Sequence, residues 1–185
     1  MRTQVAIIGA GPAGLLLAQM LHQRGIDAVV LESRSRAHIE GRIRAGLLEQ
    51  GAVETMEAAG VADRLHREGL VHHGLQLRFG GQGHRVDLSG LTGGKVVTIY
   101  GQQEAVKDMV AIRLAAGLPL HFEVEEVAIH DIASARPRVT WRQDGQDCAL
   151  DCDVIAGCDG FHGICRPSVP AADLTIFDRI YPFAW

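Results

Sequence analysis

Residues 5–14 read VAIIGAGPAG, a short apolar run that ends in a cluster of glycines. The apolar part, Val5–Ile8, is rich in β-branched residues, which is typical of a buried parallel strand. From Ala13 to Gln23 apolar residues recur at spacings of three and four, and Gly25 follows where a helix commonly ends. Ala28–Leu31 is a second apolar run. The sequence therefore predicts a strand–helix–strand unit with a right-handed crossover.

The glycines between the first strand and the helix, Gly9, Gly11 and Gly14, form the pattern GxGxxG. The first permits a tight turn, the second lets a pyrophosphate approach the backbone, and the third lets the helix pack on the sheet. Because the first amides of a helix are unpaired and lie at its positive dipole end, phosphates are expected at the helix start, beside Pro12 and Ala13. We interpret the pattern as a dinucleotide site rather than a plain strand-to-helix turn.

Charged residues near this unit support the interpretation. Glu32 ends the second strand, where an acid accepts hydrogen bonds from ribose hydroxyls and repels a 2′-phosphate, which favours NAD or the adenosine half of FAD over NADP. Arg42 and Arg44 flank Ile43, so both side chains point the same way if the chain is extended. Guanidinium groups bind phosphate oxygens in pairs, so this pair is a candidate pyrophosphate clamp. A solvated basic loop would have the same composition.

A second strand-to-turn element follows later in the chain. Val154–Ala156 leads into Asp159 and Gly160, an acid and a glycine suited either to a nucleotide hydroxyl or to a backbone turn. The histidines show no metal-ligand spacing, so we expect no metal. The four cysteines lack the spacing of redox pairs or zinc sites and are expected to be free thiols.

The rest of the pattern predicts an α/β chain with an antiparallel element. The expected segments are a loop over Ser33–Arg44, helices over Leu47–Ala59, Ala62–Glu68 and Gln103–Ala116, a hairpin of Leu75–Phe79 and His84–Leu88, strands at Val96–Tyr100, Val124–His130, Arg138–Arg142 and Cys148–Cys152, and a short helix near His162. Residues 174–185 become apolar and aromatic, so we expect a strand to begin there and the chain to be truncated.

Composition narrows the function classes. The chain has 185 residues and a net charge of −4, which is about one domain and argues against a nucleic-acid surface. No signal peptide and no apolar run near the ~18 residues of a membrane span are present in the sequence. We therefore expect a cytoplasmic protein that binds neither nucleic acid nor membrane.

Several longer segments carry a family resemblance: VAIIGAGPAGLLLAQMLHQRGID, GRIRAGLLEQGAVE, GLVHHGLQLRF, GGKVVTIYGQQE and DCDVIAGCDGFHGICRPSVP. Over essentially its whole length the chain resembles the N-terminal part of the class A FAD-dependent aromatic monooxygenases, and specifically those of the 4-hydroxybenzoate hydroxylase type. The resemblance implies one FAD, NADPH or NADH as electron donor, and O₂-dependent hydroxylation of 4-hydroxybenzoate or a similar phenol beside its hydroxyl. It also implies a homodimer for the full-length enzyme and an inactive fragment here.

By position, the resemblance assigns nucleotide contacts to three groups of residues. The ADP-binding motif matches Gly9, Gly11, Gly14 and Glu32, further FAD contacts match Arg42, Arg44 and Gln102, and the motif shared between FAD and the nicotinamide nucleotide matches Asp159, Gly160, His162 and Arg166. Ser33, Arg34 and His38 depart from the family pattern at positions associated with the 2′-phosphate of NADPH. The choice between NADPH and NADH therefore stays open.

The implied architecture is a Rossmann-like FAD-binding domain over residues 1–173, with a parallel sheet and a small antiparallel element, and the start of a substrate-binding domain over residues 174–185. The residues that hold the phenol would lie beyond Trp185, so the catalytic residues are unknown. Two alternatives remain at this stage: a nicotinamide-dependent dehydrogenase without flavin, and a non-catalytic dinucleotide-binding module.

Overall fold

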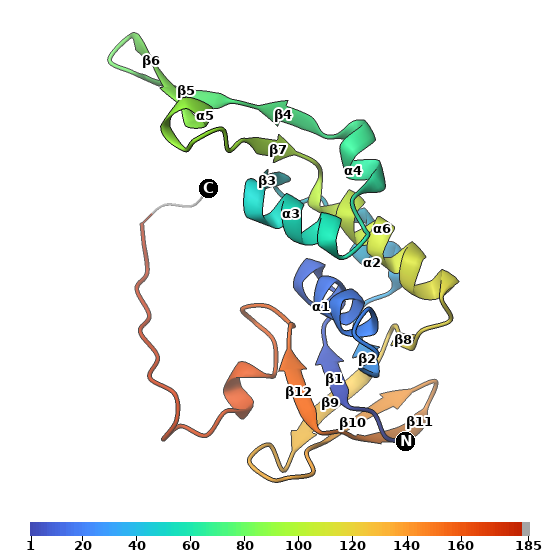
Figure 1. The fold of residues 1–185 in the computed structure, drawn as a ribbon. Coiled ribbons are helices and arrows are strands. Elements are labelled where there is room, and N and C mark those ends of the chain that lie inside the picture. Colours follow the sequence, from blue (N-terminus) through green and yellow to red (C-terminus); the bar gives the residue numbers. More distant parts are fainter. Residues whose placement is uncertain (183–185) are drawn as a thin grey trace.

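A four-stranded parallel sheet forms the centre of the computed structural model, which describes residues 1–182 (Figure 1). Its strand order is β12 (Val154–Gly157), β1 (Val5–Ile8), β2 (Ala28–Leu31) and β8 (Leu120–His121). β1 pairs in parallel with both β2 and β12. The predicted strand–helix–strand unit is thus confirmed, and β12 joins it from far along the sequence.

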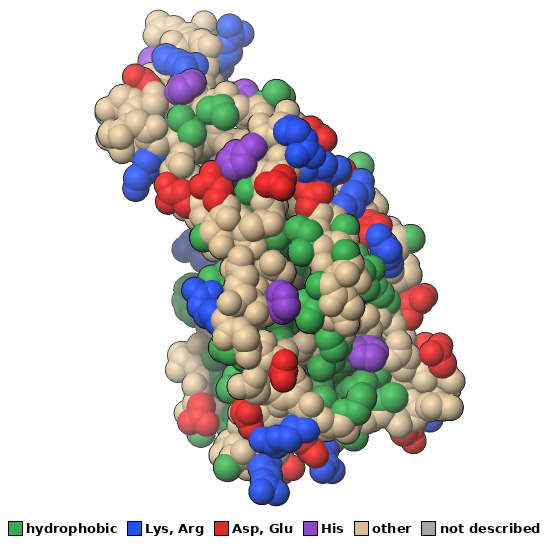
Figure 2. All heavy atoms as spheres, turned by 45° about the vertical axis from the view of Figure 1, so that its right-hand side comes forward, with side chains coloured by type: hydrophobic (Ala, Val, Ile, Leu, Met, Phe, Trp, Pro, Cys, Tyr) green, Lys and Arg blue, Asp and Glu red, His purple; other side chains and the backbone are tan. Residues whose placement is uncertain are grey.

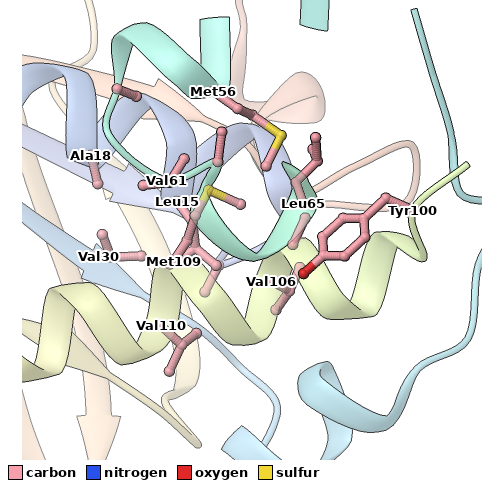
Figure 3. Packing of buried hydrophobic residues seen from close by; sticks show 14 of the residues in the cluster. Leu15, Ala18, Val30, Met56, Val61, Leu65, Tyr100, Val106, Met109 and Val110 are labelled. Carbon is pink, nitrogen blue, oxygen red and sulfur yellow. The ribbon is translucent and has the colours of Figure 1, made fainter. Parts of the chain in front are cut away.

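The two faces of this sheet pack against different layers, because successive residues of a strand point to opposite sides. Ile7 and Val30 are buried in a cluster under the helices, whereas Ile8 and Leu31 belong to a second cluster. The first cluster is covered by α1 (Pro12–His22), α3 (Gln50–Ala58), α4 (Asp63–Glu68) and α6 (Gln102–Ala115), and Figure 3 shows its packing. The second lies against an antiparallel sheet of β11 (Gln146–Asp151), β10 (Arg138–Gln143) and β9 (Glu125–His130).

Two smaller antiparallel elements extend away from this core. One is the sheet of β3 (Leu47–Glu49), β7 (Val97–Ile99) and β4 (Leu70–His72); the other is the hairpin of β5 (Gly74–Phe79) and β6 (Gln82–Asp87), followed by the short α5 (Leu88–Leu91). The hairpin projects at one end of the molecule, where Figure 2 shows histidine, lysine and arginine side chains gathered. The predicted hairpin and the strand near Val96 are confirmed.

The expected loop over residues 33–44 is wrong, because α2 (Arg36–Gly41) lies inside it. Ser35 caps this helix by accepting a hydrogen bond from the backbone N–H of His38 at 3.2 Å. Arg36 Nε lies 2.6 Å from Glu40 Oε1 one turn later. A serine cap and an ion pair at this spacing are both known helix signals, and together they outweigh the polar, turn-prone composition.

The expected helix over residues 47–59 is wrong in its first turn. Residues 47–49 form β3, which pairs in antiparallel fashion with β7, Leu47 opposite Ile99, and α3 begins only at Gln50. Pairing with a distant strand overrides local helical periodicity here. The short helix expected near His162 is a 3₁₀ turn, η1 (Arg166–Ser168), that begins later than expected.

The strand expected to begin in residues 174–185 is not present in the part of that segment that the structure describes. Residues 174–182 form neither helix nor strand, because no neighbouring strand in residues 1–182 pairs with them. Phe183 and Trp185, which prompted the expectation, lie outside the described residues. Within residues 1–182, none of the helices combines the length and apolar character needed to cross a membrane.

Arg113 anchors the end of α6 to the central sheet. It is 3% exposed and donates hydrogen bonds from Nη2 to the carbonyls of Ala28, at 2.6 Å, and Pro119, at 2.8 Å. Burial lowers the pKa of this guanidinium to about 10. The side chain therefore ties α6 to the start of β2 and to the segment before β8.

Candidate dinucleotide-binding site

A large cavity lies where three adjacent parallel strands end. Gly9 follows β1, Glu32 follows β2 and Cys158 follows β12, and all three line a cavity of about 1210 Å³. Open parallel sheets bind ligands at the carboxyl ends of their strands, so this is the position expected of a nucleotide site.

The glycines of residues 9–14, which we call the glycine loop, have three different surroundings. Gly9 has φ +103°, and a Cβ there would lie 2.5 Å from the carbonyl oxygen of Cys158. A Cβ on Gly14 would overlap the carbonyl oxygen of Gly9. A Cβ on Gly11, by contrast, would meet no protein atom within 4 Å. Gly9 and Gly14 are therefore required for packing, whereas the bare face of Gly11 is turned to open space at the cavity.

Glu32 holds the glycine loop in place while it lines the cavity. The residue is 8% exposed; Oε2 accepts a hydrogen bond from the N–H of Ala10 at 2.8 Å, and Oε1 accepts one from the N–H of Arg34 at 2.8 Å. Each carboxylate oxygen has two lone pairs, so these bonds leave acceptor capacity for a ligand hydroxyl. The acid predicted to bind ribose thus also fixes the backbone of the glycine loop.

Asp159 organises the loop after β12. Its Oδ2 accepts a hydrogen bond from the N–H of Cys165 at 2.9 Å, and Gly160 has φ +77°. Burial, with a smaller contribution from Asp159, raises the pKa of the Cys165 thiol to about 12, and burial likewise raises the pKa of the Cys158 thiol. Both thiols therefore stay protonated near neutral pH. Two roles were predicted for Asp159, contact with a nucleotide hydroxyl and support of a backbone turn. The hydrogen bond that it accepts from the N–H of Cys165 supports the turn.

Another wall of the cavity is formed by residues 42–46, which we call the arginine strap, and by the start of α6. Arg42 and Arg44 line the cavity, whereas Ile43 between them is 83% exposed and is not among its lining residues. Both arginines therefore border the same cavity, as a same-side arrangement requires, and the direction of their side chains stays a prediction. Gln102, the first residue of α6, lines the same cavity.

Most of the residues predicted from sequence meet at this cavity: Gly9, Gly11, Pro12, Ala13, Glu32, Arg42, Arg44, Gln102, Asp159, Gly160 and His162. Gly14 packs against the backbone of Gly9 and is not among the residues described as lining the cavity. Arg166 is also outside the described lining; its Cζ lies 4.3 Å from the ring centroid of Phe161. Sequence reasoning did not single out Gln103, Val124, Val127 and Phe161, which also line the cavity. Val124 and Val127 carry no motif, whereas Gln103 and Phe161 lie next to predicted residues in the segments that carry the family resemblance.

The residues present fit the ADP half of a dinucleotide. A bare glycine at a helix start and two guanidinium groups suit a pyrophosphate, and a buried acid at the end of the neighbouring strand suits a ribose. The cavity volume exceeds the range of about 300–1,000 Å³ that is typical of small-ligand pockets, which leaves room for an extended cofactor.

Comparison with known proteins agrees with this geometry. Residues 2–185 match a family model described as FAD binding domain. The chain is 50% identical to a p-hydroxybenzoate hydroxylase from Acinetobacter baylyi, over all of this chain and 46% of that protein. It is 27% identical to a 3-amino-4-hydroxybenzoate 2-monooxygenase from Streptomyces cremeus, over 90% of this chain and 42% of the relative.

Solved structures show the same fold. A probable FAD-dependent monooxygenase from Pseudomonas aeruginosa superposes with a TM-score of 0.78 at 24% identity, over 98% of this chain and 48% of that one. A p-nitrophenol 4-monooxygenase from Pseudomonas putida superposes with a TM-score of 0.76 at 21% identity, over 89% and 43%. The chain spans less than half the length of each of these four proteins. The match over residues 2–185 shows that this chain belongs to the FAD binding domain family.

Proposed function

We propose that this chain is the FAD-binding portion of a flavin-dependent aromatic hydroxylase that uses NADPH or NADH and O₂ to hydroxylate 4-hydroxybenzoate, or a similar phenol, beside its hydroxyl. The single observation that carries the proposal is the cavity at the carboxyl ends of β1, β2 and β12, with Gly11 bare on one wall and Arg44 on another. The 50% identity to a p-hydroxybenzoate hydroxylase supports the choice of substrate class.

The residues would divide the work along the cofactor. The glycine loop and the first amides of α1 would hold the pyrophosphate, together with Arg42 and Arg44, and Glu32 would accept hydrogen bonds from the adenosine ribose. Asp159, Gly160, His162 and Gln102 would contact the remaining part of the nucleotide. Bound FAD supplies the electron transfer and the activation of O₂, and this chain supplies binding and orientation.

The proposal includes a division of the chain. Residues 1–173 would form the FAD-binding domain, and residues 174–185 would belong to a substrate-binding domain. In support, within residues 1–182 the two buried clusters contain no residue after 173, whereas Ile176, Phe177 and Ile180 are 58%, 87% and 96% exposed. The phenol pocket would then require chain outside residues 1–185, and this chain alone would bind FAD without hydroxylating a phenol. A cytoplasmic homodimer would be the form of the whole enzyme.

The experiment is a titration of the purified chain with FAD, followed by an assay of NADPH and NADH oxidation with and without 4-hydroxybenzoate. We expect saturable FAD binding that ADP competes away, and no phenol-dependent oxidation. A chain that binds NADH but takes up no FAD would instead be a nicotinamide-dependent protein, and would overturn the proposal. If residues 1–185 alone hydroxylated a phenol rapidly, the phenol pocket could not lie outside them, and that part of the proposal would be overturned.

A further inference from the structure

We propose, on the basis of the function proposed above, that Tyr100, Arg64 and Asp108 are positioning residues for FAD. None of the three is among the residues described as lining the cavity. Their hydrogen-bond network fixes the two parts of the wall that reach the phosphates, the arginine strap and the start of α6.

The side-chain hydroxyl of Tyr100 joins three separate elements in this network. Tyr100, directly after β7, is 4% exposed. Its hydroxyl donates a hydrogen bond to Asp108 Oδ2 on α6 at 2.5 Å and accepts one from Arg64 Nε on α4 at 2.8 Å. Arg64 Nε also lies 2.9 Å from Asp108 Oδ1, which closes the triangle. Charge-assisted bonds in a largely buried setting are stronger than neutral ones and hold a single arrangement.

A second carboxylate extends this triangle toward the start of α6. Arg64 Nη2 donates a hydrogen bond to Glu104, two residues after Gln102. Lys107 Nζ donates to the other oxygen of Glu104 at 2.7 Å. The first turn of α6 is therefore tied to α4 as well as to Tyr100. Since Gln102 opens this turn, its position at the cavity depends on these bonds.

The backbone of Tyr100 connects the network to the arginine strap. Its N–H donates a hydrogen bond to the carbonyl of Gly46 at 2.7 Å. A Cβ on Gly46 would lie 2.6 Å from the Cα of Gly101, so the two segments touch backbone to backbone. Gly46 ends the strap two residues after Arg44, and Gly101 precedes Gln102. Movement of the Tyr100 ring would therefore be passed to both.

Substitution by phenylalanine isolates the role of the hydroxyl. In Figure 3 the ring of Tyr100 packs beside Leu65 and Val106 at one end of the buried cluster. Tyr100→Phe keeps this apolar contact and removes the two hydrogen bonds of the Tyr100 hydroxyl. The core stays filled, while the link between α4, α6 and the strap is weakened.

The test is FAD affinity, measured by quenching of flavin fluorescence, in a double-mutant cycle of Tyr100→Phe with Arg44→Met. Tyr100→Phe is expected to weaken FAD binding about tenfold, as expected for loss of one charge-assisted contact. If Tyr100 acts through Arg44, the same change in the Arg44→Met background should cost less than about twofold, because contacting or linked residues are non-additive.

Two further variants separate positioning from general stability. Val139→Ala removes a fully buried side chain from the other cluster, so it should lower the melting temperature without changing FAD affinity. Asp108→Asn keeps an acceptor for the Tyr100 hydroxyl but removes the charge, and should give an affinity between those of wild type and Tyr100→Phe. This variant also serves if Tyr100→Phe does not fold.

The inference is overturned if Tyr100→Phe binds FAD as wild type does, or if its effect is equally large in both the Arg44→Met background and a Gln102→Ala background, which removes the other cavity side chain that the network holds. A loss of affinity in Val139→Ala that matches its loss of stability would overturn it as well, since stability alone would then account for binding. In each of these cases wild type still binds FAD and the proposed function stands. If wild type takes up no FAD, both fail together.

Discussion

The glycine loop and the arginine strap line the same cavity but are held in different ways. The loop is fixed by backbone packed on backbone, with Gly9 and Gly14 too close to neighbouring carbonyls to carry any side chain. The strap is fixed at Gly46 by the segment after β7, whose position depends on Tyr100 and its charged partners. One wall is therefore specified by a short motif, and the other by contacts between residues far apart in sequence.

The largest effect is expected where the glycine loop packs. Gly14→Ala places a Cβ against the carbonyl of Gly9 and should cost about 2–3 kcal/mol of unfolding free energy, as overpacking does. Gly51→Ala, also in a helix but with open space around the added Cβ, should stabilise by about 0.5–1 kcal/mol. Urea unfolding of both variants checks the pair. Similar values for the two would contradict the packing role of Gly14.

The strap should show the opposite profile, a binding defect without a folding defect. Arg44 is exposed, so Arg44→Met should leave the melting temperature within a degree or two. Loss of charged hydrogen bonds to phosphate should weaken FAD binding by about tenfold to a hundredfold. Arg136→Met, an exposed arginine that is not among the residues described as lining the cavity, is the matched control. Equal FAD affinity in the two variants would remove Arg44 from the site.

The network behind the strap should make part of the stability depend on pH. The hydrogen bond from Lys107, followed by that from Arg64, lowers the pKa of Glu104. A lowered folded-state pKa means that this stabilisation is present above the ordinary carboxyl pKa of about 4.3 and is lost as pH falls through the folded value. Glu104→Gln should therefore lower the melting temperature at pH 7 and make little difference at pH 2. A constant difference between variant and wild type across that range would contradict this linkage.

The smallest effect concerns the thiols beside the glycine loop. Burial raises the pKa of both Cys158 and Cys165, so little thiolate is available for alkylation at pH 8. Iodoacetamide should modify them slowly in the folded chain and rapidly in urea, as followed by mass spectrometry. Because Cys158 lines the cavity, FAD should slow its modification further and leave that of Cys165 less affected. If FAD protected neither thiol from iodoacetamide, the part of the cavity that Cys158 lines would not belong to the FAD site.

The same contrast explains what the sequence could predict. GxGxxG and Glu32 act locally, through a turn, a helix start and a strand end, so their arrangement at the sheet edge follows from the motif. α2 was missed because its signals, the Ser35 cap and the pairing of Arg36 with Glu40, lie in a polar stretch without apolar periodicity. The strand at Leu47 depends on pairing with Ile99, which no local pattern contains.

The site shows the same limits. That Arg42 and Arg44 border one cavity could be predicted, because alternation in an extended chain is a local property. That Gln103, Val124 and Val127 share their cavity could not, since this depends on how α6 meets β9 and the residue before it. The role of Tyr100 was equally hidden, because its partners Arg64 and Asp108 lie on different helices.

Gly11 gives the most direct test of the central claim that this wall receives the FAD pyrophosphate. Its backbone lies in the extended region at φ −74°, and a Cβ there meets no protein atom within 4 Å, so Gly11→Leu should still fold, with a stability loss of no more than about 1 kcal/mol because leucine is a poorer N-cap than glycine. A FAD titration of this variant alongside wild type should show binding weakened at least about a hundredfold, because the side chain would occupy the space of the phosphates. FAD binding of wild-type strength in a folded Gly11→Leu chain would contradict the account.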